Sequence, residues 1–204
     1  MQSEPLTVAI LVGGYGSRMG GVDKAALELD GRPLLDRVLD AVSPFAAETF
    51  VVANDDRLVG DSRFTVLHDP EPHAGVLPAL LTALDAATSP LLLLLACDMP
   101  FVNRDVVQLL LEYAARYDAV MPYVQSFPQA MHAVYRVAPC RVAVRNLLED
   151  ANGGRRMISF LDDVNAIRVQ EDEIRRLDPE IRSFFNVNTP YDLEAARHLI
   201  GDRG

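Results

Sequence analysis

The sequence predicts an α/β fold: a single three-layer α/β/α domain, residues 1–204, with a mainly parallel, Rossmann-like sheet. Two patterns indicate this class. Short apolar segments of strand length alternate with segments whose apolar residues recur at helical spacing, which is typical of a parallel sheet with helices on both faces. The segment PLLLLLA, Pro90–Ala96, is apolar at every position, as expected of a central strand that is buried on both sides.

The first half of the chain contains five expected strands and three expected helices. The strands are the short apolar runs Val8–Val12, Thr49–Ala53, Phe64–Leu67, Pro90–Ala96 and Ala119–Pro122. The first helix begins at Pro33, a residue favoured in a first helical turn, and stops before Pro44. The second covers Val76–Ala87, and the third runs from its N-cap Asn103 to Tyr117.

The second half of the chain is less regular. Strands are expected at Met131–Val137 and Ala166–Val169, and helices at Pro139–Asp150, Arg155–Leu161, Asp172–Leu177 and Tyr191–Ile200. Thr189 is expected to cap the last helix, with Pro190 at its first position.

A glycine-rich segment follows the first strand and predicts a phosphate-binding loop. It contains Gly13, Gly14, Gly16, Gly20 and Gly21, followed or flanked by the cations Arg18 and Lys24. Glycines let successive backbone N–H groups approach an anion, and the two side chains add permanent positive charge. Neither the Rossmann fingerprint nor the Walker pattern fits these residues. The alternative is a glycine-rich turn that only reverses the chain.

Polar residues also follow other expected strands: Asn54, Asp69 and Asp98. In open α/β sheets, ligands bind outside the carboxyl ends of the strands, so these side chains are candidates for one site. Asp98 follows the most apolar strand directly, and a carboxylate there suits Mg²⁺, which commonly takes one or two carboxylates together with substrate phosphates. Alternatively, Asp98 caps the next turn through its own side chain.

The composition limits the classes of partner that the protein is expected to bind. The formal net charge of −10 argues against nucleic acid, whose binding depends on a basic surface. No apolar stretch has the length needed to span a bilayer, and the N-terminal MQSEPLT has no secretory pattern, so a cytoplasmic protein without a membrane partner is expected. Cys97 and Cys140 form no metal or disulfide motif. His68 and His132 are interpreted as packing or strand-end residues.

Three motifs resemble the molybdenum cofactor guanylyltransferase (MobA-like) family of GT-A-like nucleotidyltransferases. They are LVGGYGSRMGGVDK at Leu11–Lys24, CDMP at Cys97–Pro100 and NVNTPYDL at Asn186–Leu193. The resemblance implies transfer of GMP from GTP to the terminal phosphate of Mo-molybdopterin, with release of pyrophosphate. It also implies Mg²⁺ as cofactor and allows transient contact with molybdoenzymes or their chaperones.

The resemblance assigns roles to individual residues. Arg18, Lys24 and Asp98 would be catalytic, and Asp98 would bind Mg²⁺. Contacts to the nucleotide would come from Leu11, Val12, Gly13, Gly14, Lys24, Asn54, Asp69, Gly75 and Asp98. Contacts to the acceptor would come from Arg156, Asn186 and Asn188, with Asn188 as a further metal contact. The nucleotide part would be about residues 1–122 and the acceptor part about residues 123–204.

Two departures from the family pattern keep alternatives open. Ala79 ends the segment Gly75–Ala79 where the family has a second glycine, and Phe127 precedes Pro128-Gln129 where relatives commonly place a polar residue. The alternatives are a cytidylyltransferase or another nucleotidyltransferase with a different phosphorylated acceptor, and a nucleotide-binding regulator without turnover. On a purely structural interpretation, Asn186 and Asn188 only stabilise the turn before the last helix.

Overall fold

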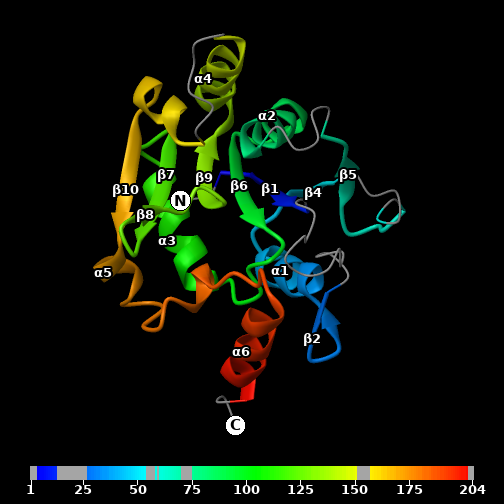
Figure 1. Cartoon of the computed structure of the whole chain (residues 1–204). Coiled ribbons are helices and arrows are strands. Elements are labelled where there is room, and N and C mark those ends of the chain that lie inside the picture. Colours follow the sequence, from blue (N-terminus) through cyan, green and yellow to red (C-terminus); the bar gives the residue numbers. More distant parts are fainter. Residues whose placement is uncertain are drawn as a thin grey trace.

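The computed structural model describes residues 4–12, 27–53, 58, 60–69, 75–150 and 157–201. Within these residues the main sheet has eight strands in the order β10-β7-β9-β6-β1-β4-β5, with β8 paired to β7 (Figure 1). The strands are β1 (Leu6–Leu11), β4 (Glu48–Val52), β5 (Thr65–Leu67), β6 (Leu91–Ala96), β7 (Ala119–Val124), β8 (Phe127–Pro128), β9 (His132–Arg136) and β10 (Ala166–Gln170). Each long strand that the sequence predicts is therefore present, with ends shifted by at most two residues.

The sheet is mixed, with parallel pairs around β1 and antiparallel pairs around β9. Strand β1 pairs in parallel with β4 and β6, β4 with β5, and β7 with β10. Strand β9 runs antiparallel to both β6 and β7, because a short connection through the β7–β8 hairpin returns the chain in the opposite direction. The predicted mainly parallel sheet is confirmed, and β9 and the short β8 are the strands that depart from it.

Side chains of the central strand β6 alternate between two hydrophobic layers. Leu91, Leu93 and Leu95 lie in the core layer that includes α1 (Leu34–Val42) and α3 (Arg104–Ala114). Leu92 and Leu94 lie in the opposite layer with α2 (Val76–Ala86) and α4 (Val137–Glu149). All five leucines are at most 3% exposed. The apolar run PLLLLLA was thus correctly interpreted as a strand buried on both faces.

Helix ends differ from the sequence predictions at several places. Helix α3 ends at Ala114, before the expected Tyr117, while Asn103 caps its start by accepting a 2.8 Å hydrogen bond from the Asp105 N–H. Helix α5 (Glu171–Ile174) is only four residues long. The expected helix at residues 155–161 is instead a 3₁₀ helix, η3 (Ser159–Asp163), and residues 155–156 lie outside the described part. Hydrophobic spacing over so few residues does not separate these helix types.

The last helix, α6 (Pro190–Gly201), is held by a separate small hydrophobic cluster. It contains Leu29, Leu34, Val187 and Ala196, and it lies next to the short hairpin of β2 (Glu28–Leu29) and β3 (Arg32–Pro33). A second 3₁₀ helix, η4 (Arg182–Phe184), precedes this region. None of the described helices is long and apolar enough to cross a membrane.

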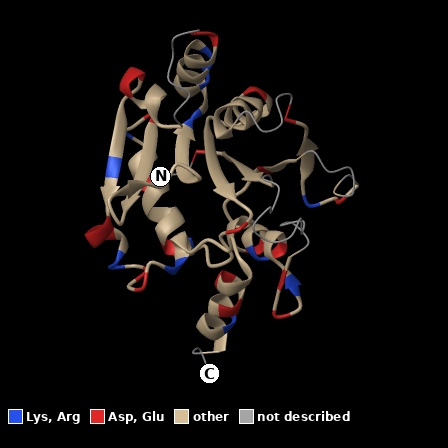
Figure 2. Cartoon of the chain, in the orientation of Figure 1, with Lys and Arg blue, Asp and Glu red and all other residues tan. Residues whose placement is uncertain are grey.

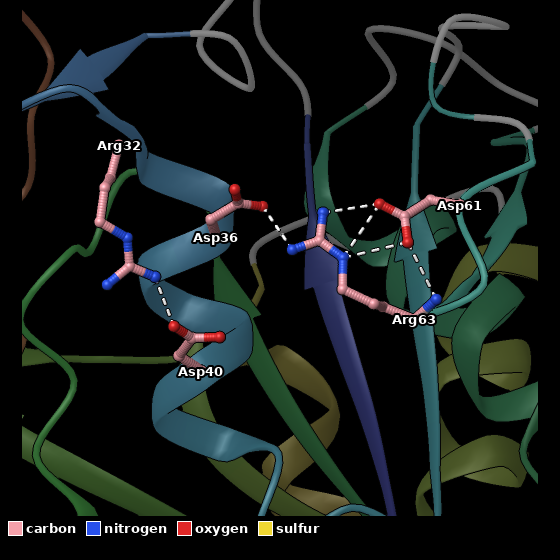
Figure 3. A network of polar contacts seen from close by, with 5 residues as sticks. All are labelled: Arg32, Asp36, Asp40, Asp61 and Arg63. Atoms are coloured by element: carbon pink, nitrogen blue, oxygen red, sulfur yellow. Dashed lines mark hydrogen bonds and ion pairs between the residues drawn. The ribbon is translucent and has the colours of Figure 1, made fainter.

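Ion pairs and hydrogen bonds connect the segment before β5 to helix α1 (Figure 3). Arg63 binds both carboxylate oxygens of Asp61 and reaches Asp36 on α1 at 2.7 Å. Hydrogen bonds from Arg63 lower the pKa of Asp61, so this carboxylate stays charged under ordinary conditions. Arg32 forms a separate ion pair with Asp40 on the same helix. The Arg63 network stabilises the start of β5, the strand that leads to Asp69.

Candidate active site

Four strands end at the same level of the sheet. Leu11 pairs with both Val52 and Ala96, and Val52 pairs with Leu67. The backbone bonds continue past the strand ends: the Cys97 N–H donates to the Leu11 carbonyl at 3.0 Å. The carboxyl ends of β1, β4, β5 and β6 therefore form one edge, as expected for ligand binding in an open α/β sheet.

Two of the carboxylates expected in the site come the same number of residues after the ends of their strands. Asp98 comes two residues after Ala96, and Asp69 comes two residues after Leu67. Both side chains are partly exposed, whereas the residues of β6 that precede Asp98 are buried. The structure thus places Asp69 and Asp98 at the carboxyl edge, each partly exposed, with one carboxylate oxygen of Asp98, Oδ1, buried.

A backbone hydrogen bond joins the turn after β6 to the turn before α6. The Val187 N–H donates to the Asp98 carbonyl oxygen at 2.9 Å, and the Val187 side chain is fully buried in the α6 cluster. Val187 stands between Asn186 and Asn188. Two motifs far apart in the sequence are therefore in contact, and both asparagines are within one residue of this contact.

Local hydrogen bonds position the two asparagines. The Asn186 side-chain amide donates to the Phe184 carbonyl at 3.0 Å. One Asp192 carboxylate oxygen accepts from the Asn188 N–H at 3.0 Å and from the Thr189 N–H at 2.8 Å. The Thr189 hydroxyl in turn accepts from the Asp192 N–H at 3.2 Å, which completes a reciprocal capping box at the start of α6. The expected N-cap Thr189 is confirmed.

Gly75 and Ala79 lie at the start of α2. Gly75 is the N-cap, with φ of 106°, a conformation that glycine adopts without strain. Ala79 is buried, and its methyl group packs in the hydrophobic layer between the sheet and α2. The alanine that replaces a family glycine therefore adds apolar contact inside the core.

The remaining expected site residues lie outside the described part of the chain. They are Gly13, Gly14, Arg18, Lys24, Asn54 and Arg156. Of the expected nucleotide contacts, Leu11 ends β1 and Val12 donates from its N–H to the Val52 carbonyl at 2.9 Å. The structure therefore brings together Leu11, Val12, Asp69 and Asp98 at one edge, with Asn186 and Asn188 beside Asp98.

Asn186 also lines a groove of about 810 Å³. We name it the Gln129 groove; its lining includes Val124, Gln125, Gln129, Asn186, Tyr191 and His198. Sequence reasoning identified only Asn186 among these residues. The departure at Phe127, directly before Pro128 and Gln129, is the one sequence signal that pointed to this region.

The donor set at Asp98 fits a hard divalent cation. A carboxylate held at the end of a buried strand, with an asparagine nearby, offers the oxygen ligands that Mg²⁺ prefers. Within the described residues no group of three or more His, Cys, Asp or Glu side chains could hold a metal. This is compatible with Mg²⁺ bound by one or two carboxylates together with substrate phosphates, rather than in an all-protein cage.

His132, on β9, is a packing residue, as interpreted from the sequence. It is fully buried, and its ring lies 4.7 Å from that of Phe184 between centroids. Burial lowers its pKa to about 4; the Ser183 backbone and the Asp178 charge oppose the shift. Neither ring nitrogen reaches normal hydrogen-bond geometry with any residue that the structure describes. His132 is therefore neutral at physiological pH.

Both cysteines are buried, and no disulfide bond joins them. Burial raises the pKa of the Cys140 thiol to about 12, and the Asp118 charge adds to the shift. A thiol in such surroundings stays protonated, which agrees with the structural role expected for it.

Comparison with known proteins relates the whole chain to one group. The family model described as the MobA-like NTP transferase domain matches residues 8–165. A probable molybdenum cofactor guanylyltransferase of Natronomonas pharaonis is 32% identical over 95% of this chain and 98% of its own length. A protein of the same description from Methanothermobacter thermautotrophicus is 34% identical over 94% of this chain and 98% of its own length.

Solved structures show the same fold. The crystal structure of molybdopterin-guanine dinucleotide biosynthesis protein A from Archaeoglobus fulgidus matches with a TM-score of 0.81 and 29% identity, over 96% of this chain and 99% of that one. The 2-C-methyl-D-erythritol 4-phosphate cytidylyltransferase of Thermus thermophilus matches with a TM-score of 0.72 at 22% identity, over 95% of this chain and 98% of that one, a likeness of fold.

Proposed function

Because this chain belongs to the MobA-like NTP transferase family, we propose that it transfers GMP from GTP to the terminal phosphate of Mo-molybdopterin. The products are molybdopterin guanine dinucleotide and pyrophosphate. The relatives described as molybdenum cofactor guanylyltransferases align over nearly their whole length, which supports carrying the activity over to this chain.

The observation that carries this proposal is the hydrogen bond from the Val187 N–H to the Asp98 carbonyl. It joins the strand edge expected to hold the nucleotide to the turn expected to face the acceptor. A transferase needs both substrates at one place, and positioning of this kind accounts for a large share of catalysis. We therefore place the reacting phosphates above Asp98, between Asp69 on one side and Asn186 with Asn188 on the other.

The transfer reaction needs no dedicated general base. A terminal phosphate oxygen of the acceptor forms a bond to the α-phosphorus of GTP, while the bond from that phosphorus to the oxygen bridging to the β-phosphate breaks. The leaving group is pyrophosphate. A phosphate monoester is already an anion at neutral pH, so no side chain has to remove a proton from it. The neutral, buried His132 has no part in this step.

Mutual repulsion of the two phosphorylated substrates is the barrier that the site has to lower. Arg18 and Lys24 are proposed to hold the triphosphate through fixed positive charge, and the N–H groups of Gly13 and Gly14 would add to them. Asp98, with Asn188 beside it, would hold Mg²⁺. When bound, this ion would offset the negative charge of both substrates' phosphates.

Base and acceptor recognition are assigned to the two parts of the chain. Residues of about 1–122 would bind GTP, with Asn54, Asp69 and Gly75 near the nucleoside. Residues of about 123–204 would bind the acceptor, with Arg156 and Asn186 toward the pterin. The methyl group of Ala79, where the family has a glycine, packs in the core and is 7% exposed.

Pyrophosphate release tests the proposal. The purified chain is mixed with Mo-molybdopterin, Mg²⁺ and, separately, GTP, CTP, ATP or UTP. We expect release with GTP and formation of the guanine dinucleotide. Release with CTP in place of GTP would favour a cytidylyltransferase. Binding of a nucleotide without any release would indicate a regulator that has lost turnover.

A further inference from the structure

A second cavity lies between helix α1, the turn after β6 and the end of α6 (Figure 1). Its volume is about 320 Å³, at the lower end of the range for sites that bind small molecules. Three arginines line it, Arg32, Arg37 and Arg104, together with the carboxylate-bearing Asp40 and several apolar residues. We name this cavity the Arg37 pocket.

The arginines of the Arg37 pocket outnumber its carboxylates. Arg32 forms its ion pair with Asp40, whereas Arg37 donates from Nε to the Leu29 carbonyl at 3.1 Å. Arg104 donates to two carbonyls in the last turn of α1, at 2.7 and 3.1 Å. A carbonyl oxygen carries only a partial charge, so these bonds satisfy N–H groups without neutralising a guanidinium. The lining residues therefore keep two more positive than negative charges, in a chain whose formal net charge is −10.

Arg37 is the most enclosed of the three arginines, since it is half-buried while Arg32 and Arg104 are exposed. Figure 2 shows basic residues at the β2–β3 hairpin and beside α1. Burial lowers the pKa of Arg37, the positive charge of Arg32 lowers it further, and the Asp30 carboxylate opposes both effects. Arginine stays protonated in proteins, so the lowered pKa indicates a positive charge that its surroundings stabilise less than water does. A bound anion would offset this charge.

Donor groups remain for such an anion. A guanidinium has five N–H groups, and the bonds of Arg37 and Arg104 to described residues engage Nε and Nη2. The two N–H groups of each Nη1 are left for a ligand within this part of the chain. Arg32 is held by the surface ion pair with Asp40 that Figure 3 shows, whose side chains are 51% and 60% exposed. Because exposed pairs contribute little, Arg32 can exchange this carboxylate for a bound anion.

The charge and the walls of the pocket indicate the class of ligand. A phosphate monoester carries a charge of about −1.5 to −2 at pH 7, which matches the excess of positive charge better than a single carboxylate does. Planar guanidinium forks also suit the oxygens of a phosphate group. The remaining lining residues are apolar and include Phe101, Val102 and Ile200. They would contact a carbon-rich part of the ligand.

We propose that the Arg37 pocket is a second anion site, which binds a small phosphate monoester with an apolar body through Arg32, Arg37 and Arg104. The site is separate from the one proposed for the reacting phosphates, since Asp98 is not among the described residues that line it. This function goes beyond the transfer reaction and does not depend on it. It involves arginines that the sequence motifs did not identify.

Phenyl phosphate is the probe, because it joins a phosphate group to an apolar ring. We expect saturable binding when it is titrated calorimetrically into the full chain at neutral pH, without GTP or Mg²⁺. Benzoate has the same ring but a single charge, and it should bind roughly tenfold more weakly. Lys24→Ala should bind phenyl phosphate like the wild type, because Lys24 is assigned to the triphosphate of GTP.

Two kinds of substitution should change the affinity in opposite directions. Arg37→Gln and Arg104→Gln should each weaken binding about tenfold, since each removes charge-assisted hydrogen bonds to the phosphate. Asp40→Asn should tighten binding, because it removes the carboxylate that competes for Arg32. A purely structural role of these residues predicts no such tightening. Arg104 is exposed, so Arg104→Gln decides the question even if Arg37→Gln does not fold.

Arg176→Gln and Asp172→Asn are the matched controls. Arg176 and Asp172 form an exposed ion pair at 3.9 Å and do not line the pocket. Their substitutions change the net charge of the chain by the same amounts as Arg104→Gln and Asp40→Asn. Neither control should change the affinity for phenyl phosphate.

The outcomes separate this site from the transfer reaction. Weaker binding by Arg104→Gln together with tighter binding by Asp40→Asn supports the pocket, whether or not the chain transfers GMP. Absence of saturable binding, equal affinity in Arg104→Gln and Arg176→Gln, or equal affinity for benzoate and phenyl phosphate overturns it. Loss of binding in Lys24→Ala alone places the phosphate at the glycine-rich loop and overturns the pocket as well.

Discussion

Val187 donates its backbone N–H to the carbonyl oxygen of Asp98 at 2.9 Å, and this bond holds the turn after the central strand against the turn before the last helix. The fully buried Val187 side chain fixes one partner, and the buried strand β6 fixes the other. The Asp98 carboxylate is thereby positioned from two sides.

Asp98→Asn should reduce guanylyl transfer about a hundredfold and raise the Mg²⁺ concentration needed for half-maximal rate. The amide keeps the size of the side chain and most of its hydrogen bonding but removes the charge that is proposed to hold the metal. The measurement is a magnesium titration of initial rate, with the melting temperature of both proteins as control. Asparagine replaces aspartate well in a turn cap. A variant with normal rate and normal magnesium dependence would therefore show that Asp98 only caps its turn.

Lys24→Ala should reduce turnover by a factor of a hundred or more without changing the melting curve, because a preorganised charge that acts in the transition state typically contributes about 3 kcal/mol. Lys24 is the only lysine in the chain, so isotope-labelled lysine gives a single side-chain NMR signal. We expect this signal to shift when GTP is titrated. A signal that does not respond to saturating GTP would contradict the assignment of Lys24 to the triphosphate.

Asp192→Ala should destabilise the protein by about 1–2 kcal/mol, since it removes the carboxylate that accepts from the Asn188 and Thr189 N–H groups. It should also raise the KM for the acceptor, because Asn188 is no longer held next to Asp98. Asp192→Asn retains an oxygen acceptor and serves as the matched control in urea unfolding. Equal stability of the alanine and asparagine variants would show that the capping box contributes little.

The stability of the protein should fall as the pH is lowered from about 6.5 toward 4. Burial lowers the pKa of His132 to about 4 in the folded state, whereas an unfolded histidine titrates near 6.5. Between these values the unfolded chain binds a proton that the folded chain does not, so acid favours unfolding, by up to about 3 kcal/mol. Above about pH 6.5 this contribution is constant.

His132→Leu removes the group and should flatten the stability profile over that interval, measured by urea unfolding at several pH values. The control is His198→Leu, which replaces an exposed histidine on α6. Glu48 also has a lowered pKa: burial alone would raise it, but hydrogen bonds from Thr7, Thr88 and Ser89 outweigh that effect. The stabilising effect of the Glu48 carboxylate is lost only at a more acidic pH than that of His132. It is the same in His132→Leu and in His198→Leu. If the free energy of unfolding of His132→Leu falls as steeply between about pH 6.5 and 4 as that of the wild type, the pH dependence does not come from His132.

The sequence by itself determined the strands, the helix starts and the residue types of the site. The leucine run of β6, the N-caps Asn103 and Thr189 and the position of Asp98 after a buried strand were all predictable. These features depend on spacing within a few residues, because side-chain periodicity and capping are local effects.

Only the tertiary structure decided which of these strands, turns and side chains come into contact. The reversal of β9, the bond between Val187 and Asp98 and the Gln129 groove all involve residues that are distant along the chain. The burial of His132 against Phe184 is of the same kind. Such contacts follow from how the layers pack, and no local pattern of residues encodes which strand becomes the neighbour of another. That physical difference explains why the positions of Asp69 and Asp98 after their strands could be predicted from the sequence while the groove beside them required the fold.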